Sequence, residues 1–127
     1  MESLAAIRQL AYRYALCLDS RDMKSLVALF PEDVRVGRDE YGREAIKRWY
    51  GRSLERFGTS IHFVGNHVID FVSPDEATGV VTCHDELEKG GEWFAAQGRN
   101  GRKGLRSFSV SGRVREPGVK LAPAGIT

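Results

Sequence analysis

The residues with the clearest chemical potential are a histidine and an aspartate that lie far apart in the sequence. His62 falls within a run of apolar, β-branched and aromatic residues, and Asp19 follows Leu18 at the end of an apolar helix face. A carboxylate near a helix C-terminus is unfavourable to the helix dipole, so Asp19 needs a compensating partner. A nearby imidazole would provide one, because the carboxylate accepts a hydrogen bond from one ring nitrogen and leaves the other as a general base. The alternatives are a structural strand histidine and an aspartate that caps the next helix or shares a solvated turn with Asp22.

The other two histidines do not complete a metal site by their spacing. His67 lies five residues after His62, so strict strand alternation places the two side chains on opposite faces, and no cysteine or carboxylate completes a ligand pattern with His84. Alternation also puts Asn66 on the face of His62, but it does not decide which face points inward. Because the three histidines lack the spacing of a ligand set, we expect no bound metal.

Three amphipathic helices are predicted in the first half of the chain, where they would position Asp19. Apolar residues recur at three- and four-residue steps behind Ser3, a good N-cap, and this first helix should end near Asp19. Asp22 is expected to cap a short second helix that Pro31 ends. A third helix, ended by Gly58, is indicated by an apolar face that comprises Ile46, Trp49, Tyr50, Leu54 and Phe57.

The period of the apolar pattern changes from 3.6 to 2 in the second half of the chain. Residues 60–72 are predicted to form a long strand, residues 77–87 a second strand antiparallel to it, and residues 92–97 a third after a Gly-Gly turn. Beyond residue 97, only residues 107–115 are predicted as a strand, and the rest as loop. Helices followed by antiparallel strands indicate an α+β fold in which the helices pack on one face of a curved sheet.

Length and composition are those of one ordinary globular domain. The 127 residues are 42% hydrophobic and 28% charged, enough for a single core. Cys17 and Cys83 lie in apolar segments and are expected to be buried thiols. No apolar run approaches the roughly 20 residues that span a bilayer, and no basic segment followed by an apolar one opens the chain, so we expect a cytoplasmic protein without a membrane partner.

The net charge of +2 hides an asymmetry between the two ends of the chain. Residues 98–127 contain seven Lys or Arg residues against the single acid Glu116, a net charge of +6, whereas residues 1–97 have 12 basic and 16 acidic residues, a net charge of −4. Phe108 is the only aromatic residue in the basic segment, so a stacking platform for nucleic acid is missing and nucleic-acid binding is not expected.

Two motifs in the expected order and spacing carry a resemblance to a known family. They are Leu-Asp-Ser-Arg-Asp at residues 18–22 and Ile-His-Phe-Val-Gly-Asn at residues 61–66, supported by Gly-Arg-Glu-Ala-Ile at residues 42–46. The sequence resembles the SnoaL-like branch of the nuclear transport factor 2-like superfamily over residues 1–97, which implies an NTF2-like cone of three helices on a curved antiparallel sheet. Residues 98–127, rich in Gly and basic residues, depart from the family pattern and are set apart as an atypical C-terminal segment.

Within the superfamily, the pattern is most similar to the scytalone dehydratase and hexachlorocyclohexane dehydrochlorinase families. There an aspartate at the end of helix one orients a sheet histidine that acts as base, and Asp19 and His62 match these positions. The resemblance implies a cofactor-independent lyase or isomerase acting on a small hydrophobic, cyclic molecule. His84 matches a second pocket histidine of scytalone dehydratase. The remaining expected substrate contacts are Tyr14, which is otherwise a core residue, Asn66, which otherwise satisfies strand backbone at a bulge, and Trp49.

Two alternatives stay open on the sequence alone. The first is a non-catalytic domain that binds a small molecule or forms oligomers, and the second is a structural partner similar to the small subunit of ring-hydroxylating oxygenases. In either case the open face of a curved sheet would expose apolar residues, so we expect a homo-oligomer, a trimer or a dimer.

Overall fold

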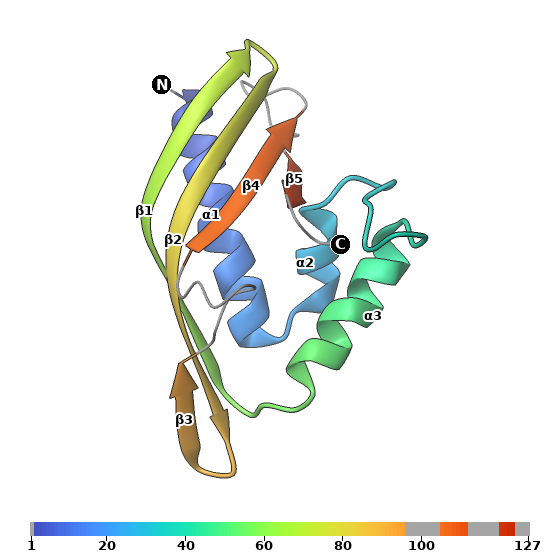
Figure 1. Cartoon of the computed structure of the whole chain (residues 1–127), viewed down its shortest axis with the longest axis vertical. Helices are drawn as coiled ribbons and strands as arrows, with labels where there is room; N and C mark the ends of the chain where they lie inside the picture. The colour runs from blue at the N-terminus through green and yellow to red at the C-terminus, as the bar shows by residue number, and fades with distance from the viewer. Residues whose placement is uncertain (1, 96–104, 112–119, 124–127) are drawn as a thin grey trace.

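The computed structural model describes residues 2–95, 105–111 and 120–123 of the chain. Within these ranges the helices precede the strands, as the change of period predicts (Figure 1). None of the helices in these ranges has both the length and the apolarity needed to cross a membrane. The elements are α1 (Glu2–Ser20), α2 (Met23–Ala28), α3 (Arg43–Leu54), β1 (Ser60–Ser73), β2 (Glu76–Lys89), β3 (Glu92–Ala95), β4 (Leu105–Ser111) and β5 (Lys120–Pro123).

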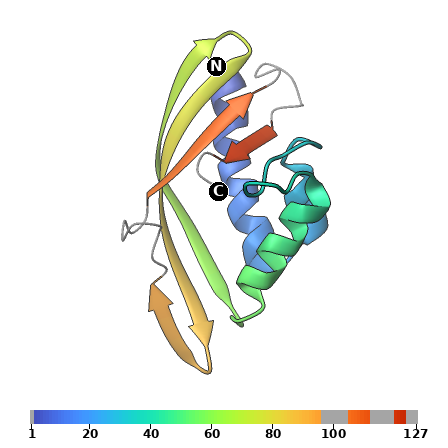
Figure 2. The ribbon, with the colours of Figure 1, turned by 45° about the vertical axis from the view of Figure 1, so that its right-hand side comes forward.

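Strand β2 lies at the centre of an antiparallel sheet. One edge of β2 pairs with β1 along its length. The other edge pairs with β4 over residues 76–82 and with β3 over residues 86–89. The β2–β3 hairpin turns at Gly90 and Gly91, whose φ angles of 61° and 84° suit the two-residue turns that join antiparallel strands. The sheet is curved and the helices lie on one side of it (Figure 2). The predicted α+β fold, helices on a curved antiparallel sheet, is therefore confirmed.

The C-terminal segment contributes more strand than the sequence analysis predicts. Strand β4 begins at Leu105, two residues earlier than expected, and residues 112–115 of the predicted strand lie outside the described ranges. Strand β5 falls where only loop was expected, and it pairs with β4 from Phe108 to Ser111. It was missed because four residues that include a proline show too little alternation to be distinguished from a loop.

The hydrophobic core lies between the helices and the sheet. Its largest fully buried side chains are Ile7, Leu26, Phe30, Ile46 and Val81, which come from α1, α2 and the segment after it, α3 and β2. Both cysteines are free and buried, as expected from their apolar surroundings. Burial, with a smaller contribution from the neighbouring Asp22 carboxylate, raises the pKa of the Cys17 thiol.

The turn between α1 and α2 determines where the helix end points. Arg21 adopts a left-handed backbone with φ 58°. Its N–H donates to the Leu18 carbonyl at 3.2 Å, and the N–H of Asp22 donates to the Cys17 carbonyl at 2.9 Å, the double closure of a Schellman motif. The Asp22 side chain then accepts from the Ser25 N–H at 3.1 Å and caps α2 as predicted. Hydrogen bonding from the Ser25 side chain, and then from its backbone N–H, holds the pKa of Asp22 below its usual value. Asp19 is thereby left in the last turn of α1, directed toward the sheet.

A β-bulge interrupts the pairing of β1 with β2 near the middle of β1. Val64 pairs with Cys83 and His67 with Val81, so Gly65 and Asn66 together lie opposite a single β2 residue. The extra residue reverses the alternation, and the face that carries His62 before the bulge carries His67 after it.

Candidate active site

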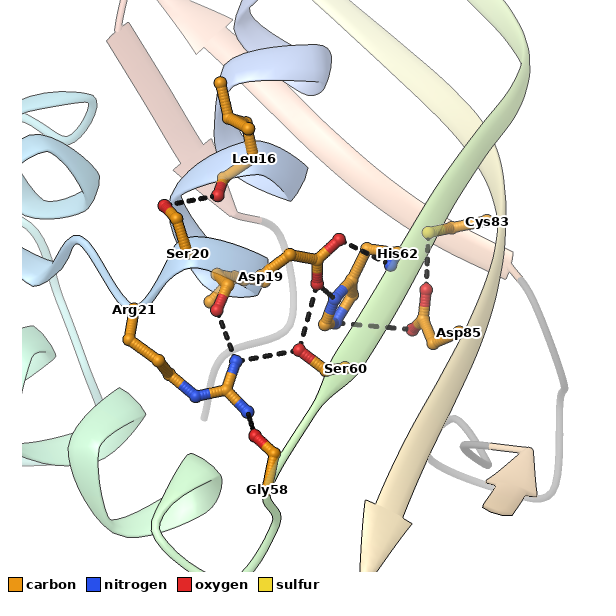
Figure 3. A network of polar contacts seen from close by, with 10 residues as sticks. Leu16, Asp19, Ser20, Arg21, Gly58, Ser60, His62, Cys83 and Asp85 are labelled. Carbon is orange, nitrogen blue, oxygen red and sulfur yellow. Dashed lines mark hydrogen bonds and ion pairs between the residues drawn. The ribbon is translucent and has the colours of Figure 1, made fainter.

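Asp19 and His62 meet where the end of α1 crosses the first residues of β1. The ring Nδ1 of His62 lies 2.6 Å from Asp19 Oδ1, and the backbone N–H of His62 donates to Oδ2 at 2.8 Å. The hydroxyl of Ser60 also donates to Oδ1, at 2.9 Å (Figure 3). The His62 side chain is only 9% exposed and that of Asp19 is 27% exposed, so the pair is largely shielded from water.

The hydrogen bonds define which groups around Asp19 donate and which accept. The backbone N–H can only donate, and Ser60 accepts from Arg21 at 2.7 Å, which leaves its own proton for Asp19. An ionised aspartate accepts all of these hydrogen bonds, because a carboxylate has acceptor sites on both oxygens. Facing this carboxylate, Nδ1 of His62 is the donor, and in the neutral form of the ring Nε2 carries the free electron pair.

His62 lines a cavity of about 140 Å³ between α1, α3 and the sheet. A cavity of about 150 Å³ accommodates benzene, so this one matches a single ring in size. Most of its wall is aliphatic or aromatic, and His62 and Asp85 supply its imidazole and its carboxyl group. The lining residues are Tyr14, Leu18, Trp49, Tyr50, Ser53, Leu54, Phe57, His62, Asp85 and Leu87.

Asp85 is a site residue that the sequence analysis missed. It is 5% exposed, its Oδ2 lies 4.0 Å from Nε2 of His62, and its Oδ1 accepts from the Cys83 thiol at 2.6 Å. The signal was present in the sequence, because Val81, Cys83 and Asp85 alternate along β2 and the first two are apolar.

Tyr14 and Trp49 both line the cavity, as the sequence analysis expects of substrate contacts. The hydroxyls of Tyr14 and Tyr50 lie 2.9 Å apart, so α1 and α3 are bridged at the cavity wall. The ring of Trp49 packs edge-on against Tyr50, with centroids 4.8 Å apart. Tyr14 thus combines its two expected roles, since it packs against the core and presents a phenol to the cavity.

His84 and Asn66 do not line the cavity, so their expected role as substrate contacts is wrong. The His84 side chain is 67% exposed, and its Nε2 lies 3.5 Å from Glu86 on the outer face of the sheet. Strand alternation allows either His84 or Asp85 to face inward, and Asp85 does. Asn66 is exposed within the bulge, the alternative position considered for it.

The expected orientation of His67 is also wrong, because the bulge turns its side chain inward. Neither ring nitrogen has a hydrogen-bond partner, and both are buried. Burial, and to a lesser extent the charge of Arg8, lowers the pKa of His67. Across the described residues, no group of three or more His, Cys, Asp or Glu side chains is arranged to hold a metal ion.

The helix-covered curved sheet and the pocket between them define an NTF2-like α+β protein. The chain belongs to the SnoaL-like family, because the sequence profile of the SnoaL-like domain matches residues 1–104. No protein of curated function matches the sequence.

Solved structures of low sequence identity share this fold. A scytalone dehydratase-like protein from Novosphingobium aromaticivorans, named as putative in that role, superposes with a TM-score of 0.72 at 22% identity, over 94% of this chain and 78% of the other. A hexachlorocyclohexane dehydrochlorinase, LinA type 2, gives 0.70 at 22% identity over 94% and 80%. A Mycobacterium tuberculosis protein of unknown function, Rv3472, gives 0.74 at 18% identity over 94% and 67%.

Proposed function

We propose that the protein is a cofactor-independent lyase or isomerase that removes a proton from a small, hydrophobic, cyclic molecule. The observation that carries the proposal is the 2.6 Å contact between Asp19 and His62 Nδ1 at the wall of an apolar cavity. This contact leaves Nε2 as a base at a place from which water is largely excluded. The names of two structural neighbours, a dehydratase and a dehydrochlorinase, belong to the same reaction class.

In the proposed reaction, His62 Nε2 takes a proton from a substrate carbon. The electrons of that C–H bond form a double bond to the adjacent carbon, from which hydroxide or chloride departs with its electron pair. In an isomerisation the proton instead returns from the imidazolium to a different carbon. Asp19 remains ionised throughout and stabilises the imidazolium that forms.

Asp85 gives the proposed site a second polar group. Because Nε2 and Oδ2 are 4.0 Å apart, one ligand atom can lie within hydrogen-bond distance of both. A substrate hydroxyl at this point would donate to one group and accept from the other, according to their protonation. Tyr14 and Trp49 would contact the ring of the substrate from the helix side.

The proposal is tested by an elimination assay on single-ring compounds that carry a hydroxyl or chloride next to an acidic C–H bond. His62→Gln removes the base, and we expect kcat to fall about 10²- to 10⁴-fold. The matched control is His84→Gln, an exposed histidine on the outer face of the same sheet, which should leave kcat unchanged. Ring compounds that bind, with no elimination or proton exchange above the buffer rate, would favour the non-catalytic binding domain instead.

Asp19→Asn tests the tautomer argument in the same assay. The backbone N–H of His62 is always a donor, so the Asn oxygen must occupy the Oδ2 position and its NH₂ group must face the imidazole. The ring is then expected to move its proton to Nε2, where it blocks the base, and kcat should fall by about 10²-fold or more. Asp70→Asn, on the exposed part of β1, is the matched control for loss of a carboxylate.

A further inference from the structure

Arg21 lies beside the candidate active site in a backbone conformation that is unusual for an arginine. Its φ of 58° is in the left-handed region, and no other non-glycine residue among those described has a positive φ. Glycine is the usual residue at this position of a helix end, because any side chain there costs free energy. An arginine that accepts this strain indicates that its side chain has a role of its own.

The guanidinium of Arg21 connects three segments around Asp19. Nη1 donates to the Leu18 carbonyl and, at 2.7 Å, to the Ser60 hydroxyl, and Nη2 donates to the Gly58 carbonyl at 2.9 Å (Figure 3). It thus joins the last turn of α1 to the residues that lead into β1.

Two further hydrogen bonds connect Ser60 to the imidazole of His62 through Asp19. Ser60 is 3% exposed and has a single hydroxyl proton. Because its oxygen accepts from Arg21, that proton is directed at Asp19 Oδ1, the same oxygen that faces Nδ1 of His62. Without the guanidinium, the hydroxyl would be free to rotate away, and Asp19 would lose a donor that orients it.

We propose that Arg21 is a positioning residue that orders the Asp19–His62 pair through Ser60. A role of Arg21 in catalysis rests on the proposed function, whereas the hydrogen-bond relay from Arg21 to His62 does not depend on it. Arg21 does not line the cavity, and among its three hydrogen-bond partners only Leu18 does, so we assign its effect on the pair to this relay.

Arg21→Gly removes the guanidinium without disturbing the backbone, because glycine accepts the φ of 58° without strain. The variant therefore tests the side chain alone. The readout is the tautomer ratio of the neutral His62 ring, measured from its ¹⁵N chemical shifts. We expect the wild-type ring to be protonated at Nδ1, and the variant to shift about two- to tenfold toward the Nε2–H form, as the loss of one hydrogen bond would produce. Millimolar guanidinium ion, far below denaturing concentrations, should partly restore the wild-type ratio.

The matched control is Arg43→Gln, because Arg43 also binds a backbone carbonyl, that of Phe30, but away from the pair. This variant should leave the tautomer ratio unchanged even where it lowers stability. If Arg21→Gly fails to fold, Ser60→Ala removes the relay alone and should give the same shift.

A wild-type ratio in the folded Arg21→Gly protein, or in Ser60→Ala, would overturn the proposal and leave Arg21 as a clamp on the helix end. The ratio is measured without substrate, so failure to find elimination activity would count against the proposed function and not against the relay.

Discussion

His67 shows how one buried side chain can make stability depend on pH. Its two ring nitrogens are buried without partners, and burial lowers its pKa. In the unfolded chain the ring has its ordinary pKa of about 6.5. As the pH falls below this value, the unfolded chain takes up a proton that the folded protein resists, so stability is full above about pH 6.5 and declines toward the lower folded pKa.

His67→Leu should remove this pH dependence. Leucine has no proton to gain and no polar atoms to leave unpaired. The free energy of unfolding of the variant protein should therefore change less than that of the wild type between about pH 7.5 and pH 5. Urea titrations at the two pH values provide the measurement. Equal losses of stability in both proteins would show that other groups are responsible.

At the scale of elements, the close pairing of β1 and β2 depends on Gly79. A Cβ at this position would lie 2.9 Å from the carbonyl oxygen of Val68 and 3.1 Å from Nε2 of His67. Gly79→Ala must therefore push the two strands apart, and we expect it to destabilise the protein by about 1–3 kcal/mol. Denaturant midpoints measure the change.

Gly51 is the matched control, because a Cβ there would meet no atom within 4 Å and the residue lies inside α3. Gly51→Ala should stabilise the protein by about 1 kcal/mol through helix propensity. If both substitutions changed the free energy of unfolding in the same direction, the close approach of the strands at Gly79 would not explain the effect of Gly79→Ala.

At the scale of the whole molecule, the outer face of β1 and β2 exposes several large apolar side chains. Phe63 is 68% exposed and Val68 61% exposed, and Val68 pairs with Val80, which is 42% exposed. A second copy of the chain remains the predicted partner for this face, as expected from the sequence.

Phe63→Glu should weaken self-association about 10- to 100-fold, since burial of a phenylalanine contributes about 1.5–3 kcal/mol. Sedimentation velocity over a range of concentrations measures the effect. Tyr41→Glu replaces a similarly exposed aromatic residue, 62% exposed, in the loop before α3 and should leave association unchanged. A wild-type chain that stays monomeric at all concentrations would contradict the prediction.

The sequence by itself determined the order of the elements up to β4 and pointed to Asp19 and His62 as the central pair of the candidate site. Local patterns were sufficient for this, because the helix period, the cap at Asp22 and the alternation in β1 are properties of neighbouring residues. The family motifs then related Asp19 to His62, which no periodicity could do. In the structure the two side chains come within hydrogen-bond distance because the end of α1 crosses the start of β1.

Only the tertiary structure decided which side chains on the strands face inward. The bulge at Gly65 and Asn66 reverses the alternation, which brings His67 inside and leaves Asn66 outside, and the register of β2 brings Asp85 to His62 instead of His84. Strand patterns specify two faces but not which of them the helices will cover, and a single added residue exchanges them. The relay from Arg21 likewise exists only after the helix end and the start of β1 come together.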